Sequence, residues 1–219
     1  MTFDVVLLAL ASTVRPTSLA AVYTLLSDNE PRRLMIAYVI AGLAFTIAFG
    51  LLVTLAFHGI SINHGSDEAK GIAEIVGGAV VLGFGGLVLR GRVGGPRAGD
   101  APRAPGRWER LLEGRRTVKT AALAGPLTHI PGLFYLVALN IIVAHNPSAT
   151  VGAGEILLYN VIWFAVPIAA LATCLVRPST ARDAIAWVND WTRRHTRGIL
   201  VGVSLFVGVV LLVRGVVTV

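Results

Sequence analysis

Arg15 and Pro16 stand near the middle of an apolar stretch, Val5–Leu26, that is long enough to cross a bilayer as a helix. A guanidinium at that depth costs about 3 kcal/mol on insertion scales and is tolerated mainly where it faces a bundle interior, a cavity or a partner. Its planar donors suit a carboxylate, phosphate or sulfate. Because Pro16 lacks a backbone donor, the helix is expected to kink or open there. We therefore predict a polar site inside a membrane bundle; the alternative is a kink whose arginine reaches the headgroups.

A second proline, Pro131, follows His129 in another apolar stretch, so His129 is predicted to be the counterpart of Arg15. A histidine could exchange a proton near neutral pH. A hydrogen-bonded structural role is the favoured interpretation for this one. Glu74, near one end of the third apolar stretch, is the expected counter-charge for Arg15.

Other polar residues inside the apolar stretches complete the candidate site. Asn140 and Asn160 are expected to make hydrogen bonds between helices. The predicted substrate-binding set is Arg15, Pro16, Thr17, Ser18, Glu74, His129, Pro131, Asn140, Tyr159 and Asn160. We find no metal-ligand spacing, no phosphate-binding glycine loop and no catalytic constellation, so no metal, no cofactor and no enzymatic activity are expected.

The composition indicates an integral membrane protein. Of 219 residues, 55% are hydrophobic and only 14% charged, and the mean hydropathy is +0.74. Six apolar stretches are each long enough to cross a bilayer: 4–26, 34–57, 71–90, 118–144, 154–176 and 198–218. The predicted fold class is all-α, a polytopic membrane protein with six transmembrane helices.

The net charge of +7 is concentrated in alternate connections between these stretches. Basic residues cluster at 32–33, 90–119 and 177–197, whereas the other connections contain only Lys70. The positive-inside rule then predicts a multi-pass protein of the inner membrane with both termini outside. Between membrane spans, the central cluster fits anionic headgroups better than nucleic acid, so phospholipids are the expected contact and no nucleic-acid partner is expected.

The two halves of the chain resemble each other, which predicts two inverted three-helix repeats. Pro16 is followed fifteen residues later by Pro31, and Pro131 sixteen residues later by Pro147. Discontinuous helices in opposed repeats are typical of transporters. The predicted parts are 1–93 for the first repeat, 94–117 for a basic cytoplasmic linker with a short amphipathic helix at 108–112, and 118–219 for the second repeat.

Two further patterns concern packing. Small residues recur every fourth position at Gly42, Thr46 and Gly50, at Ala73 and Gly77, at Ala79 and Gly83, and at Gly198 and Gly202. Packing within the chain is the favoured explanation, and a homodimer seam is the alternative. In the segment 179–195, Ile185, Val188 and Trp191 form an apolar stripe, so this segment lies either in the membrane interface or against the bundle.

The stretch 125–140 (GPLTHIPGLFYLVALN) resembles the fourth span of the GAP proteins, the glycopeptidolipid- and sulfolipid-addressing proteins of the LysE transporter superfamily. The stretch 159–167 (YNVIWFAVP) is similar to their fifth span, and so is the early pattern of Pro16, Ser27, Pro31-Arg32-Arg33 and Ala41-Gly42. The resemblance extends over essentially the whole chain, including the basic linker. It implies a six-span inner-membrane protein that helps move large envelope lipids outward, often beside an RND-type lipid transporter.

Arg15 departs from the family pattern, in which a small residue precedes this proline, and it favours an anionic lipid. The first hypothesis is therefore a transporter or transport accessory for an anionic envelope lipid or glycolipid. Two alternatives stay open: a LysE-type proton-coupled exporter of small solutes, and a membrane scaffold that docks a larger lipid transporter. The exporter needs intramembrane acids to hold a cation, and only Glu74 qualifies from the sequence.

Overall fold

The computed structural model describes residues 2–13, 15–58, 67–91, 117–145 and 148–218, and these form helices and short connections without a strand. The helices are α1 (Thr2–Thr13), α2 (Pro16–Leu26), α3 (Pro31–His58), α4 (Asp67–Leu89), α6 (Val118–Thr128), α7 (Leu133–His145), α8 (Ala149–Trp163), α9 (Ala165–Val176) and α10 (Pro178–Thr218). The predicted all-α fold class is confirmed.

Three helical segments are long and apolar enough to cross a membrane alone: Pro31–Ala56, Gly71–Leu89 and Arg194–Thr218. Three further helix pairs pass the same test together but bend sharply, by 58° between α1 and α2, 67° between α6 and α7, and 61° between α8 and α9. If each bent pair is one span, the chain has six, at the positions that the hydropathy predicts. Large apolar side chains such as Leu52, Val176 and Val217 are exposed on the outside, as lipid contact requires.

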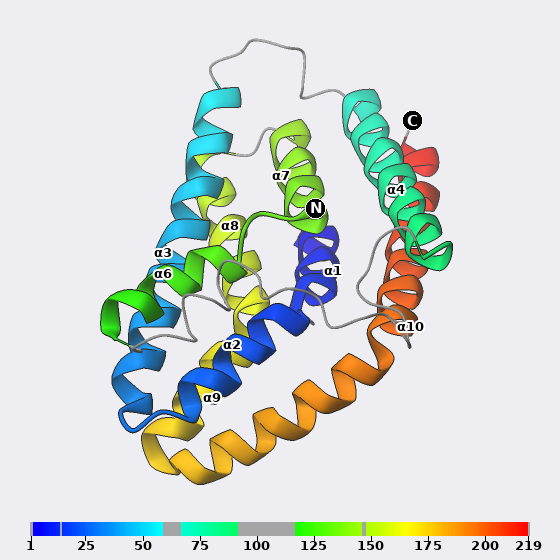
Figure 1. Ribbon diagram of the computed structural model, residues 1–219. Helices are drawn as coiled ribbons and strands as arrows, with labels where there is room; N and C mark the ends of the chain where they lie inside the picture. The colour runs from blue at the N-terminus through cyan, green and yellow to red at the C-terminus, as the bar shows by residue number, and fades with distance from the viewer. Residues whose placement is uncertain (1, 14, 59–66, 92–116, 146–147, 219) are drawn as a thin grey trace.

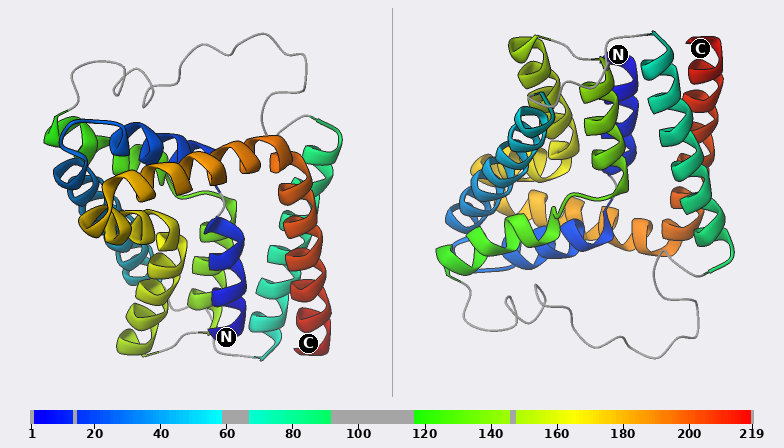
Figure 2. Two further views of the ribbon diagram at one scale, coloured as in Figure 1. Left: turned by 90° about the horizontal axis from the view of Figure 1, so that it is seen from below. Right: turned by 90° about the horizontal axis from the view of Figure 1, so that it is seen from above.

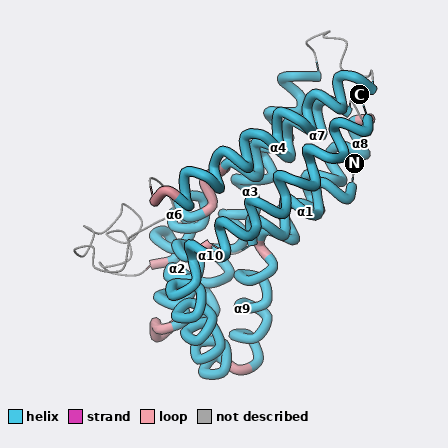
Figure 3. Tube along the Cα trace, turned by 90° about the vertical axis from the view of Figure 1, so that its right-hand side faces the viewer, coloured by secondary structure: helices cyan, strands magenta, loops and turns pink. Residues whose placement is uncertain are grey.

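The spans run between two ends of one bundle (Figure 1). Both termini lie at the same end, and the first part of α10 runs along the opposite end before the helix turns upward beside α4 (Figure 2). The side view shows the same division, with α2 and α9 at the end away from the termini (Figure 3). A chain that crosses the membrane an even number of times must have both termini on the same side.

Prolines explain where the bent pairs break. Pro16 is the first residue of α2, a position where a missing backbone donor costs nothing. Pro131 lies in the gap between α6 and α7. The break between α8 and α9 was not predicted; Pro167 is the third residue of α9 and cannot donate to the carbonyl of Trp163, four residues earlier.

The inverted repeat stays a prediction, as do the boundaries of the three parts. The first half contains one bent pair followed by α3 and α4, and the second contains two bent pairs followed by α10. Most of the basic linker, including the amphipathic helix predicted at 108–112, lies outside the described residues.

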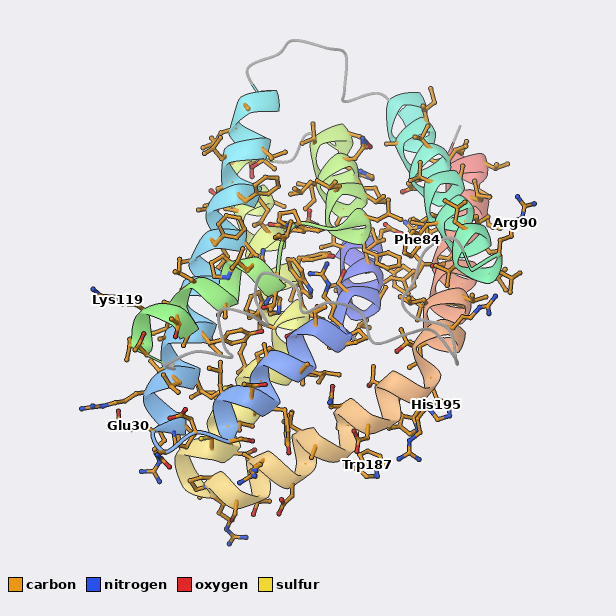
Figure 4. All side chains as sticks on the ribbon, in the orientation of Figure 1. Glu30, Phe84, Arg90, Lys119, Trp187 and His195 are labelled. Atoms are coloured by element: carbon orange, nitrogen blue, oxygen red, sulfur yellow. The ribbon has the colours of Figure 1, made fainter. Side chains whose placement is uncertain are left out.

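The amphipathic segment at 179–195 forms the first part of α10 and packs on the bundle through one face. Ile185 is buried in an apolar cluster with residues of α2 and α3, and Val188 packs against the same cluster. Trp187 and Trp191 are exposed, and Figure 4 shows Trp187 pointing away from the bundle. Trp191 therefore does not continue the buried stripe.

Small residues allow close helix contact at some of the predicted positions and not at others. A Cβ on Gly42 would lie 2.8 Å from the Phe164 ring, and one on Gly77 would lie 2.8 Å from Val137. A Cβ on Gly83, Gly198 or Gly202 would meet no described residue within 4 Å, so the expected close packing against the described helices is wrong for these three glycines.

Gly125 gives the sharpest test of this packing. A Cβ there would collide with the backbone oxygen of Tyr38 and lie 2.9 Å from the nitrogen of Gly42. We expect Gly125→Ala to lower the free energy of unfolding by about 1–3 kcal/mol, because backbone atoms cannot move aside as a flexible side chain can. Thermal unfolding in detergent measures this effect.

Gly154→Ala is the matched control, because a Cβ there meets nothing within 4 Å. Alanine should stabilise α8 by about 0.5–1 kcal/mol through its higher helix propensity. Equal melting temperatures for the two variants would contradict the close α3–α6 contact.

Candidate functional site

Arg15 lies at the break between α1 and α2 and reaches across to the break between α6 and α7. Its backbone is extended, and it precedes the first residue of α2. Nη1 donates to the carbonyl oxygens of Thr128 at 3.3 Å and Ile130 at 3.4 Å, and Nη2 donates to Ile130 at 3.4 Å. These carbonyls are available because the helix ladder is interrupted at Pro131.

The third break contributes an aromatic surface to the same place. The guanidinium carbon of Arg15 lies 5.1 Å from the centroid of the Trp163 ring, at the end of α8. A cation over an indole ring is stabilised by about 0.5–2 kcal/mol. Gly132 leaves space for the guanidinium, since a Cβ there would lie 2.9 Å from Nη2. All three helix breaks therefore meet at one arginine, and Figure 4 shows side chains filling the space between these helices.

The positive charge of Arg15 has no acidic counter-charge in the described part of the chain. Its three carbonyl contacts, at 3.3–3.4 Å, are longer than charge-assisted hydrogen bonds, which usually measure about 2.7–2.9 Å. Arginine has five N–H donors, so these contacts leave part of its capacity unused. The side chain is partly buried.

His129 sits behind this arginine in a complete hydrogen-bond network. Nδ1 lies 3.1 Å from the Gly125 carbonyl, which can only accept, so Nδ1 carries the hydrogen. Nε2 then accepts from the Ser18 hydroxyl at 3.3 Å. The Tyr38 hydroxyl lies 3.1 Å from Ser18 and 2.8 Å from Thr128. The ring also stacks on Phe164 with centroids 3.9 Å apart. This geometry favours the structural role for a neutral His129.

An aromatic cluster extends from Trp163 toward the end of the bundle that holds the termini. Tyr135 and Tyr159 lie 5.3 and 5.9 Å from the Trp163 ring, centroid to centroid. Asn160 donates to the Tyr135 hydroxyl at 3.2 Å, so its predicted interhelical hydrogen bond is confirmed. The Tyr159 hydroxyl bonds the Ser12 hydroxyl. Trp163 Nε1 is buried and has no acceptor among the described residues.

The structure thus brings together most, but not all, of the predicted residues. Arg15, Ser18 and His129 meet at the breaks that Pro16 and Pro131 accompany, and Tyr159 and Asn160 adjoin them through Trp163. Thr17 and Asn140 are exposed, on α2 and α7 respectively.

Two specific expectations are wrong. Asn140 makes no hydrogen bond with any described residue, because its side chain is on the exposed face of α7. Glu74 is not the counter-charge of Arg15: it is buried elsewhere, with Oε1 3.9 Å from Nε2 of His145. The sequence places Arg15 and Glu74 inside spans but does not say which spans are neighbours.

Sequence reasoning missed the roles of Tyr38, Thr128 and Trp163. Tyr38 is one tyrosine in a long apolar helix, so no local pattern distinguishes it from a core residue. Trp163 was part of a recognised motif, YNVIWFAVP, but its position under Arg15 depends on the unpredicted break between α8 and α9.

Comparison with known proteins identifies a family. The sequence model described as SfLAP, "Sap, sulfolipid-1-addressing protein", matches residues 5–217. Neither the curated proteins nor the solved structures provide a match to the chain.

Tyr38→Phe tests the network behind Arg15. The change removes the hydroxyl shared by Ser18 and Thr128, so we expect a loss of about 1–3 kcal/mol in the free energy of unfolding. Tyr23→Phe is the matched control, because the Tyr23 hydroxyl makes no hydrogen bond with the described residues. A melting temperature for Tyr38→Phe that matches Tyr23→Phe would contradict a structural role for the network.

Proposed function

The chain belongs to the sulfolipid-1-addressing protein family, and from this premise we propose that it moves, or helps to move, an anionic envelope lipid outward across the inner membrane. The headgroup binds Arg15, and the acyl chains stay in the surrounding lipid. A sulfated glycolipid fits best, because the family description names a sulfolipid and a sulfate matches the donor fork of a guanidinium.

One observation carries the proposal: a guanidinium at the meeting point of three broken helices lacks an acidic partner among the described residues. Moving such a charge to bilayer depth costs about 3 kcal/mol or more. The long carbonyl bonds and the Trp163 ring offset only part of that cost. An anionic headgroup would supply the missing charge and shorter, charge-assisted bonds.

The neighbouring groups suit this headgroup. Trp163 Nε1 is a second donor that has no acceptor among the described residues, and the buried hydroxyl and amide groups of Tyr135, Tyr159 and Asn160 lie beyond it. Such groups are expected to bind the hydroxyls of a sugar. Broken spans present unpaired backbone groups at membrane depth, and these are tolerated only where protein or a cavity covers them. In this proposal, the backbone groups at the breaks give the headgroup polar contacts on its way across the membrane.

The charge distribution supports an orientation with both termini outside. The start of α3, with Arg32 and Arg33, the end of α4, next to Arg90, and the basic first part of α10 lie at the end of the bundle away from the termini (Figure 2). The positive-inside rule assigns that end to the cytoplasm, where it would contact anionic phospholipids.

Two protein partners are part of this proposal, each at its own surface. The basic cytoplasmic end is a docking surface for an RND-type lipid transporter, which would provide the driving force that the described residues of this chain do not reveal. Gly198 and Gly202 face open space on α10 and suit close contact with a second copy. No enzymatic step is part of this proposal.

Lipid binding in detergent tests the role of Arg15. We expect a sulfated galactosylceramide to raise the melting temperature of the purified protein, and the same lipid without its sulfate to have little effect. Arg15→Gln should weaken binding of the sulfated lipid about tenfold to a hundredfold, the loss expected for one charge-assisted hydrogen bond. Arg33→Gln is the control, because Arg33 is exposed and pairs with Glu30.

Equal binding of the sulfated lipid by wild type and Arg15→Gln would refute the proposed site. Gly132→Ala gives a second variant that keeps the charge: its Cβ would displace the guanidinium and should also weaken binding. In the native host, deletion of the gene should reduce an anionic lipid at the cell surface, and Arg33→Gln but not Arg15→Gln should restore it.

A further inference from the structure

A second buried polar cluster lies away from Arg15, near the end of the bundle that holds the termini. Asp4 of α1 accepts a 2.7 Å bond from Nη1 of Arg214 on α10. Glu74 of α4 faces His145, the last residue of α7, at 3.9 Å. Asp4 is fully buried and Glu74 is 2% exposed. The sequence places Asp4 and Arg214 in apolar stretches, which is the signal that could have identified them.

These two pairs join two parts of the bundle. The glycines of α4 and α10 pack the two helices together, since a Cβ on Gly78 would lie 2.9 Å from the Gly208 carbonyl and one on Gly215 would lie 2.7 Å from the Gly71 carbonyl. α4 and the last part of α10 run side by side beyond α1 and α7 (Figure 2). The ion pair Asp4–Arg214 joins α1 to α10, and the contact Glu74–His145 joins α4 to α7. Both therefore cross the boundary between α1 and α7 on one side and α4 and α10 on the other.

When His145 is neutral and Glu74 is ionised, no hydrogen lies between the two side chains. Nδ1 of His145 lies 2.8 Å from the carbonyl oxygen of Ile141, which can only accept, so Nδ1 carries a hydrogen. In the neutral ring, Nε2 is then an acceptor, and it faces a carboxylate that also only accepts. The second carboxylate oxygen, Oε2, is buried without a hydrogen-bond partner among the described residues.

The charges around Glu74 do not resolve this mismatch. Among the described residues, Asp4, Arg214 and His145 act on the carboxyl group electrostatically. Arg214 makes its short bond to Asp4 instead. No group of three or more His, Cys, Asp or Glu residues among those described could hold a metal ion, so a proton suits the pair better than a metal cation.

We propose that Glu74 and His145 form a proton-binding site that fastens α4 to α7. One proton from water binds at Nε2 of His145 or at the Glu74 carboxyl, and the two atoms, which lie 3.9 Å apart, then approach to form a single N–H···O or O–H···N hydrogen bond. No covalent bond to a heavy atom changes. The side chain of His145 is 14% exposed and gives the proton its route to the otherwise buried Glu74. Loss of the proton leaves two acceptors facing each other and loosens the boundary.

This site stands on its own geometry and does not depend on the lipid proposed for Arg15. Its experiment uses the full-length protein in lipid, with ¹⁵N in the histidine rings and ¹³C in the glutamate carboxyl groups. Solid-state NMR reports imidazolium, and infrared spectroscopy reports protonated carboxyl groups. Over the pH range in which the protein stays folded, wild type should bind one proton that Glu74→Gln does not bind. Glu30→Gln, at an exposed position, should retain it.

His145→Gln is the second variant, because a glutamine amide can donate to Glu74 in place of the proton. We expect it to keep the fold, as judged by circular dichroism and gel filtration, and to lose the same proton. If Glu74→Gln or a folded His145→Gln binds as many protons as wild type across this pH range, the proposal is wrong. A wild-type protein that gains neither signal would overturn it equally.

Discussion

The guanidinium of Arg15 needs hydrogen-bond acceptors in a part of the protein where nearly all backbone oxygens are used within helices. It finds them in the carbonyls of Thr128 and Ile130, which are available only because the helix is interrupted at Pro131. Pro16 in turn opens the helix that presents the arginine, and the break before Ala165 presents the ring of Trp163. Three proline-associated breaks and one charge thus form a single unit.

The groups behind this unit hold it in one arrangement. Behind the arginine, Tyr38, Ser18, Thr128 and His129 satisfy one another's hydrogen bonds, and Phe164 stacks on the imidazole. A satisfied buried network specifies one arrangement of the helices that carry it. The arginine itself keeps N–H donors that make no hydrogen bond with the described residues. α1 connects this site to the second polar cluster, since Asp4 lies near its beginning and Arg15 follows its end.

Much of the architecture follows from the sequence because apolar length, proline and charge act locally. The three single spans, the bent pairs that would make six, and the breaks at Pro16 and Pro131 need only hydropathy and the missing proline donor. The break at Phe164 lies ahead of Pro167 by the same rule, so the sequence contains a signal for this break although it was not predicted. The partners of Glu74, the exposed position of Asn140 and the contact between Arg15 and Trp163 depend on which helices are neighbours. Helix packing decides these, and no local sequence pattern shows which helices are neighbours.

The central claim is that an anionic headgroup completes the coordination of Arg15. An electron cryo-microscopy structure of the protein in nanodiscs that contain a sulfated glycolipid tests it most directly. The account predicts headgroup density within hydrogen-bonding distance of the Arg15 guanidinium, between the Thr128–Gly132 segment and Trp163. Lipid density elsewhere on the protein, with Arg15 still bonded only to the carbonyls of Thr128 and Ile130, would contradict it.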